Sequence, residues 1–314
     1  MVTSQATGTH VLQGKNLISM RDFTRDDLLA FLEEAEAFED FSETVLLGKV
    51  LGSLFFEPST RTNLSFSAAM QRLGGSVLGF ADAQVSSTAK GESLSDTIRV
   101  VENYCDIILL RHPQEGAARL AAESTSLPVI NAGDGTNQHP TQTLLDLYTI
   151  RKTRGRLDNL KIAFVGDLKY SRTVHSLIEM LAHFESELFL ISPPTLQIPS
   201  EFLEDLDVRG TTYREDEDFF SITQDVDILY TTRIQQERFP DPVEYEKVKN
   251  AYRIDRAAVE KIGDGITIMH PLPRRNEIAT DLDDYPGSAY FEQVANGVTV
   301  RKAVLCSMLG VNRE

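Results

Sequence analysis

Residues 56–62, with the sequence FEPSTRT, form the segment of this chain best suited to binding an anion. Ser59 stands where a helix would begin, so the free N–H groups of the next turn would face outward and the helix dipole would favour negative charge. The hydroxyls of Ser59, Thr60 and Thr62 add donors, and Arg61 adds a fixed planar charge. The pattern alone fits equally well a capped helix that carries one surface arginine. It contains no GxxxxGK sequence, so it does not indicate a nucleotide triphosphate site.

Five more basic residues stand where a ligand could reach them. Arg111 directly follows the apolar run 107–110, and Arg172 follows a turn at residues 166–167 that lacks the GxGxxG pattern of a dinucleotide site. Arginine presents a planar fork that matches carboxylates and phosphates, so a pocket for several anionic groups would need such residues. Taken alone, each is more often a surface charge without a role. The five are Lys90, Arg111, Arg172, Arg233 and Arg274.

His139 and Gln142 are the uncharged residues best suited to acting on a carbonyl group. His139 precedes Pro140, which is typical of a first helical turn, and a helix N-terminus favours a neutral imidazole. Such an imidazole can polarise a carbonyl by donating a hydrogen bond, and Gln142, one turn further on the same face, can accept from an NH2 group. The alternative for His139 is a capping or core histidine. No His, Cys or Asp cluster has the spacing of metal ligands, so we expect no metal.

The elements that must position these residues alternate between short β-rich runs and amphipathic helical stretches. This alternation is typical of α/β folds whose parallel sheets are covered by helices on both faces. In such sheets ligands lie beyond the carboxyl ends of the strands, where nearly all of the residues above are expected. The expected strands are residues 50–56, 76–80, 107–110, 129–131, 161–165, 188–191, 228–231 and 266–269. The expected helices are residues 60–73, 93–104, 115–123, 140–153, 172–184, 257–262 and 291–309.

The alternation restarts after residues 154–156, which predicts two domains with a hinge near residues 150–158. We expect a first domain over residues 1–150 and a second over residues 151–288. A C-terminal helix over residues 289–314 is expected to pack back on the first domain. A chain of 314 residues with 41% hydrophobic residues is long enough for two cores.

Composition narrows the classes of partner. The formal net charge of −16 argues against nucleic acid, because proteins that bind it usually carry a basic patch. The apolar runs are far too short to cross a bilayer, and residues 1–10 are too polar for a signal peptide, so we expect no membrane association. Cys105 and Cys306 have no CxxC spacing, which fits a reducing cytoplasm.

Several short segments, in order along the chain, resemble the aspartate/ornithine carbamoyltransferase family. Residues 59–62 (STRT) resemble its phosphate-binding signature Ser-x-Arg-Thr, and residues 86–93 (SSTAKGES) resemble its mobile loop. The segments that resemble its aspartate branch, the aspartate carbamoyltransferases, are 111–116 (RHPQEG), 137–142 (NQHPTQ), 166–176 (GDLKYSRTVHS), 232–235 (TRIQ) and 270–274 (HPLPR).

The resemblance implies a transferase that moves the carbamoyl group of carbamoyl phosphate to the amine of L-aspartate. The products are N-carbamoyl-L-aspartate and phosphate, in the committed step of de novo pyrimidine biosynthesis. The first domain would bind carbamoyl phosphate and the second L-aspartate, in a cytoplasmic enzyme that uses no cofactor. Both substrates are anionic and repel each other in one pocket, which gives a reason for clustered cationic residues on an acidic chain.

The family's contacts to carbamoyl phosphate fall on ten residues of this chain. By resemblance Thr62, Arg111 and His139 stabilise the oxyanion, Arg61 balances charge on the departing oxygen, and Gln142 accepts from the carbamoyl NH2; these five are the expected catalytic residues. The turn 270–273 supplies carbonyl acceptors, and its Leu272-Pro273 bond is a candidate for the cis form. The ten are Ser59, Thr60, Arg61, Thr62, Ser87, Arg111, His139, Gln142, Leu272 and Pro273.

The expected contacts to aspartate are Arg172 and Arg233, which would hold its two carboxylates, together with Lys90 and Gln235. One alternative is transfer to another amine such as ornithine. That branch typically has a cysteine where this chain has Pro271, and a cationic acceptor would disfavour the two arginines. A second alternative is a non-catalytic α/β module that keeps the fold but would be expected to lose some of Arg61, Arg111, His139 or Gln142.

The loop 86–93 implies a homotrimer with shared active sites, because in the family this loop reaches into the neighbouring subunit. Ser87 and Lys90 would then act in the site of the next subunit. The loop is shorter by a residue than in some relatives, which leaves Ser86 and Ser87 as alternative donors to the phosphate. The sequence also leaves open whether a regulatory subunit joins the trimers into a larger allosteric holoenzyme.

Overall fold

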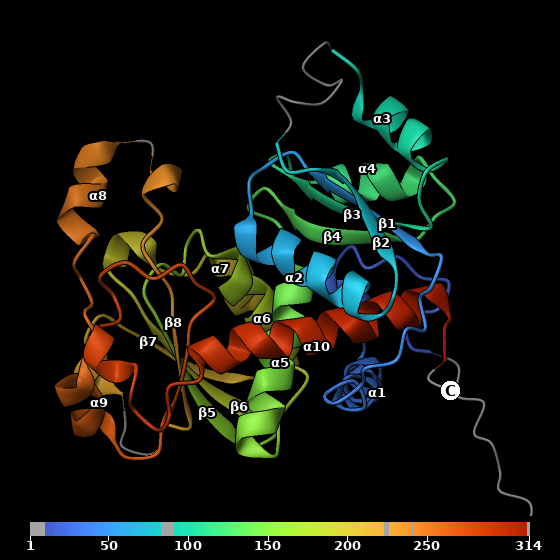
Figure 1. The fold of residues 1–314 in the computed structure, drawn as a ribbon. Helices are drawn as coiled ribbons and strands as arrows, with labels where there is room; N and C mark the ends of the chain where they lie inside the picture. Colours follow the sequence, from blue (N-terminus) through green and yellow to red (C-terminus); the bar gives the residue numbers. More distant parts are fainter. Residues whose placement is uncertain (1–9, 83–90, 223–225, 240, 313–314) are drawn as a thin grey trace, which may run out of the picture. The chain divides into compact units, whose positions relative to one another are not determined.

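The computed structural model describes residues 10–82, 91–222, 226–239 and 241–312 (Figure 1). The chain forms two compact units, one from Met1–Thr141 with Gly297–Glu314 and one from Gln142–Asn296. The division falls inside helices α5 (Pro140–Arg154) and α10 (Tyr290–Leu309), so each of these helices contributes residues to both units. The first unit is therefore built from two stretches of chain that are far apart in sequence.

The first unit contains a four-stranded parallel sheet in the order β2-β1-β3-β4. Figure 1 shows α3 and α4 over one face of this sheet and α2 over the other. The central strands are apolar and buried on both faces, which is typical of a covered parallel sheet. The elements are α1 (Arg25–Glu36), β1 (Val50–Phe55), α2 (Thr60–Arg72), β2 (Ser76–Phe80), α3 (Leu94–Val101), β3 (Ile107–His112), α4 (Ala117–Glu123) and β4 (Val129–Asp134).

The second unit contains a five-stranded parallel sheet in the order β7-β6-β5-β8-β9. Ala163 and Val165 of β5 belong to the core that includes Val259 of α9, whereas Phe164 lies against Tyr230, whose hydroxyl bonds to α5. Helices therefore cover both faces. The elements are β5 (Leu160–Val165), α6 (Arg172–Leu181), β6 (Ser186–Ile191), α7 (Ser200–Arg209), β7 (Thr212–Asp216), β8 (Ile228–Thr231), α8 (Pro242–Val248), α9 (Arg256–Ile262) and β9 (Thr267–Met269).

The predicted fold class is confirmed, since both sheets are parallel, both are covered by helices, and α10 contributes to the first unit. Among the α-helices and strands of the described residues, four were not predicted, namely α1, α7, β7 and α8. Among the described residues, no helix is long and apolar enough to span a membrane.

Candidate active site

The start of α2 presents the predicted anion-binding groups. Ser59 occupies the N-cap position in an extended conformation, but its side chain makes no capping hydrogen bond. The Ser59 hydroxyl therefore accepts no hydrogen bond from the N–H groups of the first turn. Thr60 and Arg61 are exposed and Thr62 is buried. This arrangement of N–H groups, hydroxyls and a positive charge at a helix N-terminus is suited to a phosphate.

Arg111 lies within the last two residues of β3, at the carboxyl end of a strand next to β1. The pairing of β3 with β4 shifts register between Leu110 and His112, so the irregularity falls at Arg111. The guanidinium donates to the carbonyl of Ala132 on β4 at 3.1 Å and pairs with Glu57 at 3.0 Å. Arg111 is thereby held at the carboxyl ends of β1, β3 and β4, which we call the first edge.

Asp134 organises the loop that leads from β4 to His139. Its buried carboxylate accepts hydrogen bonds from the backbone N–H of Gly116 at 2.9 Å and from the side chain of Asn131 at 2.9 Å. It also accepts from the side chain of Asn137 at 3.1 Å. His139 is buried just before α5, with its Nδ1 3.5 Å from the hydroxyl of Thr141. The first edge thus carries the 59–62 segment, Arg111 and His139.

Asp167 joins the two loops that carry the predicted aspartate-binding arginines. These loops follow β5 and β8, which are neighbouring strands. The Asp167 carboxylate accepts from the backbone N–H of Tyr170 at 2.9 Å and of Gln235 at 3.3 Å. Burial raises its pKa to about 6, although these two N–H groups and the charge of Arg233 act to lower it.

The carboxyl ends of β5, β8 and β9, which we call the second edge, carry three of the four residues predicted to bind aspartate, namely Arg172, Arg233 and Gln235. Arg172 is the first residue of α6, and Arg233 follows β8. The side-chain amide of Gln235 donates to the carbonyl of Tyr170 at 3.1 Å, which links the same two loops a second time. Two arginines with planar forks beside strands that adjoin in one sheet are suited to a dicarboxylate.

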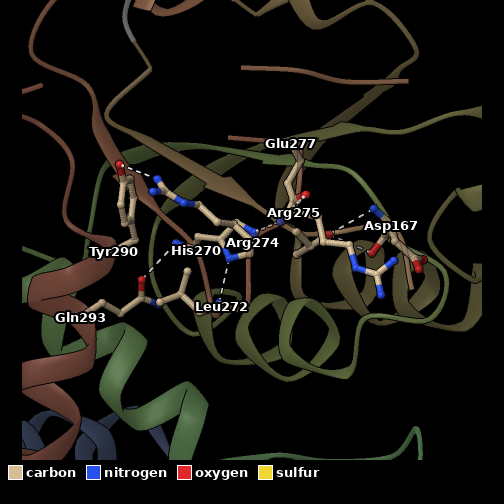
Figure 2. A network of polar contacts seen from close by, with 9 residues as sticks. Asp167, His270, Leu272, Arg274, Arg275, Glu277, Tyr290 and Gln293 are labelled. Carbon is tan, nitrogen blue, oxygen red and sulfur yellow. Dashed lines mark hydrogen bonds and ion pairs between the residues drawn. The ribbon is translucent and has the colours of Figure 1, made fainter. Parts of the chain in front are cut away.

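The turn after β9 contains the cis peptide bond for which the sequence offered a candidate. The Leu272-Pro273 bond is cis, as predicted, and Leu272 has a positive φ of 54°. The N–H of Leu272 donates to Nδ1 of His270 at 2.7 Å, and Nε2 of His270 bonds to Glu277 at 2.9 Å (Figure 2). A left-handed conformation is uncommon for a residue other than glycine and persists where surrounding contacts hold it.

Arg274, the remaining predicted cation in this turn, is engaged by an acidic partner. Its guanidinium pairs with Asp283 through both carboxylate oxygens, one of them at 2.7 Å. It also lies 3.3 Å from the hydroxyl of Tyr290 (Figure 2). The hydrogen bonds that Asp283 accepts from Arg274 and from the Tyr290 hydroxyl lower the pKa of its carboxyl to about 2. The charge of Arg274 is therefore already balanced within the second unit.

Three predicted residues, Ser86, Ser87 and Lys90, lie outside the described residues. The sequence reasoning also missed residues that hold others in place, namely Glu57, Asp134 and Asp167. Glu57 and Asp167 lie inside segments already singled out, but the identity of their partners required the fold. Among the described residues, no group of three His, Cys, Asp or Glu side chains could hold a metal ion.

Two family models match the chain. One is described as the carbamoyl-P binding domain of aspartate/ornithine carbamoyltransferase and covers residues 15–152, and the other is the Asp/Orn binding domain and covers residues 158–308. The chain belongs to the aspartate/ornithine carbamoyltransferase family.

A member of this family from Methanocaldococcus jannaschii is similar to this chain over nearly its whole length. The aspartate carbamoyltransferase catalytic subunit of Methanocaldococcus jannaschii is 54% identical over 304 residues, which cover 95% of this chain and 99% of that protein. A solved structure of the M. jannaschii subunit matches with a TM-score of 0.87 at 54% identity, covering 92% of this chain and 96% of that one.

Another family member has been solved with both substrates. The aspartate transcarbamoylase of Trypanosoma cruzi in complex with carbamoyl phosphate and aspartate matches with a TM-score of 0.91 at 38% identity. The match covers 97% of this chain and 99% of that one. The family's fold therefore accounts for both units of the chain.

Proposed function

We propose that this protein transfers the carbamoyl group of carbamoyl phosphate to the amine of L-aspartate, giving N-carbamoyl-L-aspartate and phosphate. This is the committed step of de novo pyrimidine biosynthesis. The observation that carries the choice of acceptor is the bracing of the Arg172 and Arg233 loops by the single buried carboxylate of Asp167. A braced pair of arginines fits the two carboxylates of aspartate and would repel the cationic side chain of ornithine.

Carbamoyl phosphate is assigned to the first edge and to the residues that contact its NH2 group. The phosphate binds Ser59, Thr60, Arg61 and Thr62 at the start of α2, where the exposed charge and the free capping position support an anion. Thr62, Arg111 and His139 donate to the carbamoyl oxygen. Gln142 and the carbonyl groups of Leu272 and Pro273 accept from the NH2.

The chemistry is an attack of the neutral aspartate amine on the carbamoyl carbon. The new C–N bond forms a tetrahedral intermediate, whose oxyanion is stabilised by the three donors at about 3 kcal/mol for each. The bond from carbon to the bridging oxygen then breaks, and Arg61 balances the charge that develops on that oxygen. The departing phosphate takes the proton from the amine, so no protein side chain has to act as a general base. Catalysis consists of positioning and electrostatics.

The assembly that we propose is a homotrimer in which Ser87, or in its place Ser86, and Lys90 act in the site of the neighbouring subunit. This rests on the likeness of residues 86–93 to the family loop. A regulatory subunit that joins such trimers is a further partner to be tested by co-expression and light scattering. A cytoplasmic location is supported by the two cysteines, Cys105 and Cys306, which do not form a disulfide with each other.

The decisive experiment is a product assay with the purified full chain and carbamoyl phosphate, with L-aspartate or L-ornithine as acceptor. We expect N-carbamoyl-L-aspartate, and no citrulline above the uncatalysed rate. Citrulline as the main product would replace the proposed acceptor by ornithine. No product with either acceptor at saturating concentrations would favour the non-catalytic alternative.

A further inference from the structure

A fully buried carboxylate, Asp146, lies one helical turn after Gln142 on α5 and collects three hydrogen bonds. Its Oδ1 accepts from the side-chain amide of Gln142 at 2.9 Å and from that of Gln293 at 2.6 Å. Its Oδ2 accepts from the hydroxyl of Tyr230 at 2.8 Å. Asp146, Tyr230 and Gln293 are buried, whereas Gln142 is only partly buried, so the group opens to its surroundings at Gln142.

The direction of every hydrogen bond in this group is fixed. The backbone N–H of His270 donates to Oε1 of Gln293 at 3.0 Å, which turns the NH2 of Gln293 toward Asp146 (Figure 2). Burial, together with the charge of Asp146, raises the pKa of the Tyr230 hydroxyl well above its usual value, so Tyr230 stays protonated and donates. An ionised carboxylate can only accept, and it therefore also fixes the NH2 of Gln142 on its own side.

The amide oxygen of Gln142 is consequently the end of the side chain that faces away from Asp146. Because the carboxylate holds the NH2 end of the amide on its own side, the oxygen is the end that is presented to a ligand on the other side, and an oxygen can only accept. At the far end of the same group, Gln293 holds the N–H of His270, and His270 in turn holds the N–H of Leu272 at 2.7 Å. The turn that carries the Leu272 carbonyl is thus tied to the same carboxylate.

We infer that Asp146 is a positioning residue that keeps Gln142 and the 270–273 turn as hydrogen-bond acceptors and so makes the site select a carbamoyl group. The inference rests on the proposed function, in which both acceptors face the carbamoyl NH2. Acetyl phosphate has nearly the same shape but carries a methyl group in place of the NH2. A methyl group cannot donate, so it would leave both acceptors unsatisfied, and unsatisfied polar groups discriminate strongly against such an analogue.

The test compares the affinities of the full chain for carbamoyl phosphate and acetyl phosphate by calorimetric titration. In Asp146→Ala the amide of Gln142 loses its anchor and can turn its NH2 toward the ligand. We expect the preference for carbamoyl phosphate over acetyl phosphate to fall by about tenfold or more, the effect of one lost hydrogen bond. A residue that served only the fold would weaken both ligands equally.

Two further variants sharpen the result. Asp146→Asn keeps one oxygen that can accept from both glutamine amides, so it should retain the preference to within about threefold, as expected for one preserved acceptor. Thr149→Val is the matched control, because Thr149 lies one turn further along α5 and accepts from Asn296 of α10 at 3.1 Å. It removes a buried polar link between the same two helices without touching Gln142, and the preference should not change.

An unchanged preference in a folded Asp146→Ala protein would overturn the inference. If that variant does not fold, Gln293→Met takes its place, because it removes the link between Asp146 and His270. It should lower the preference for carbamoyl phosphate by a smaller factor. An unchanged preference in Gln293→Met would also contradict the inference. A wild-type protein that forms no carbamoyl aspartate would instead overturn the proposed function. The product assay therefore tests the proposed function, and the binding preference tests the role of Asp146, so the two failures can be told apart.

Discussion

The side chain of Asp167 is buried, and its titration should be visible in the pH dependence of the free energy of unfolding. Its pKa is raised from 3.8 to about 6, chiefly by burial. The folded protein therefore holds this proton over a pH range in which the unfolded chain has released it. By linkage, the contribution of Asp167 to the free energy of unfolding is largest below pH 4 and falls as the pH rises through about 6.

Asp167→Asn removes this titration. The variant should gain stability relative to wild type as the pH is raised from about 4 to about 7, by up to roughly 3 kcal/mol for a pKa shift of this size. Urea unfolding of both proteins across this range measures the difference. A difference that is constant with pH would contradict the raised pKa of Asp167.

Arg172 should affect the KM for aspartate but not the KM for carbamoyl phosphate. Arg172→Met removes a fork assigned to an aspartate carboxylate, and the KM for aspartate should rise about 10- to 100-fold, the range expected for hydrogen bonds to a charged group. The KM for carbamoyl phosphate should stay within about threefold, because that substrate has other contacts. Arg214→Met is the control, since Arg214 is 65% exposed and pairs with Glu187 on β6. Initial rates with each substrate varied in turn decide the matter.

The sequence allowed prediction of residues that stand next to a recognisable boundary. Arg111 follows the apolar run 107–110 of β3, and His139 precedes a proline that starts a helix, so their neighbours along the chain indicated their positions. Asp146 could not be found in this way, because its partners Tyr230 and Gln293 are 84 and 147 residues away. Residues that position others through long-range contacts require the fold.

At the scale of elements, Gly166 determines how closely the loops after β5 and β8 can approach. It has a φ of 123°, and a Cβ atom there would lie 2.3 Å from the carbonyl oxygen of Thr232. The neighbouring N–H of Asp167 donates to the Thr232 hydroxyl at 3.1 Å. A side chain at this position would therefore force apart the loops that carry Arg172 and Arg233.

Gly166→Ala should lower kcat/KM for aspartate by more than about tenfold and destabilise the protein by about 1–3 kcal/mol, the usual cost of a strained backbone. Gly210→Ala is the matched control, because Gly210 also has a positive φ, 72°, but a Cβ atom there would meet nothing within 4 Å. It should cost only about 1 kcal/mol and leave kcat/KM unchanged. Thermal unfolding and initial rates of the two variants test the contrast.

Two of the elements that the sequence did not predict, β7 and α7, were missed because few of their residues are buried. Strand β7 lies at the edge of its sheet, and four of its five residues are exposed, so it has no apolar run to mark it. Helix α7 has four acidic residues among its ten and a single buried residue, Leu206. The central strands β1, β3 and β5, which are buried on both faces, were predicted to within a few residues. A strand that is buried on both faces has a continuous apolar run, which can be recognised in the sequence.

At the scale of the whole molecule, the proposed homotrimer with shared sites makes a quantitative prediction. Arg61→Ala and Lys90→Ala chains should each be inactive as pure trimers. When they are mixed after dissociation, each mixed trimer contains one interface at which an intact Arg61 meets an intact Lys90, and random mixing should restore about a quarter of the wild-type activity. Activity that stays at the level of the separate variants would argue against shared sites.

The first unit includes the last part of α10, and this has a consequence for folding during synthesis. The first unit is completed by Gly297–Glu314, where the Lys302 ammonium donates to the carbonyl of Phe41 at 2.8 Å and the Ser307 hydroxyl accepts from the N–H of Leu12 at 3.0 Å. On a ribosome, these partners emerge only after all of Gln142–Asn296 has been synthesised. The part of the protein that is translated first therefore completes its packing only after the last residues of the chain have been made, and we expect it to be prone to aggregation until then.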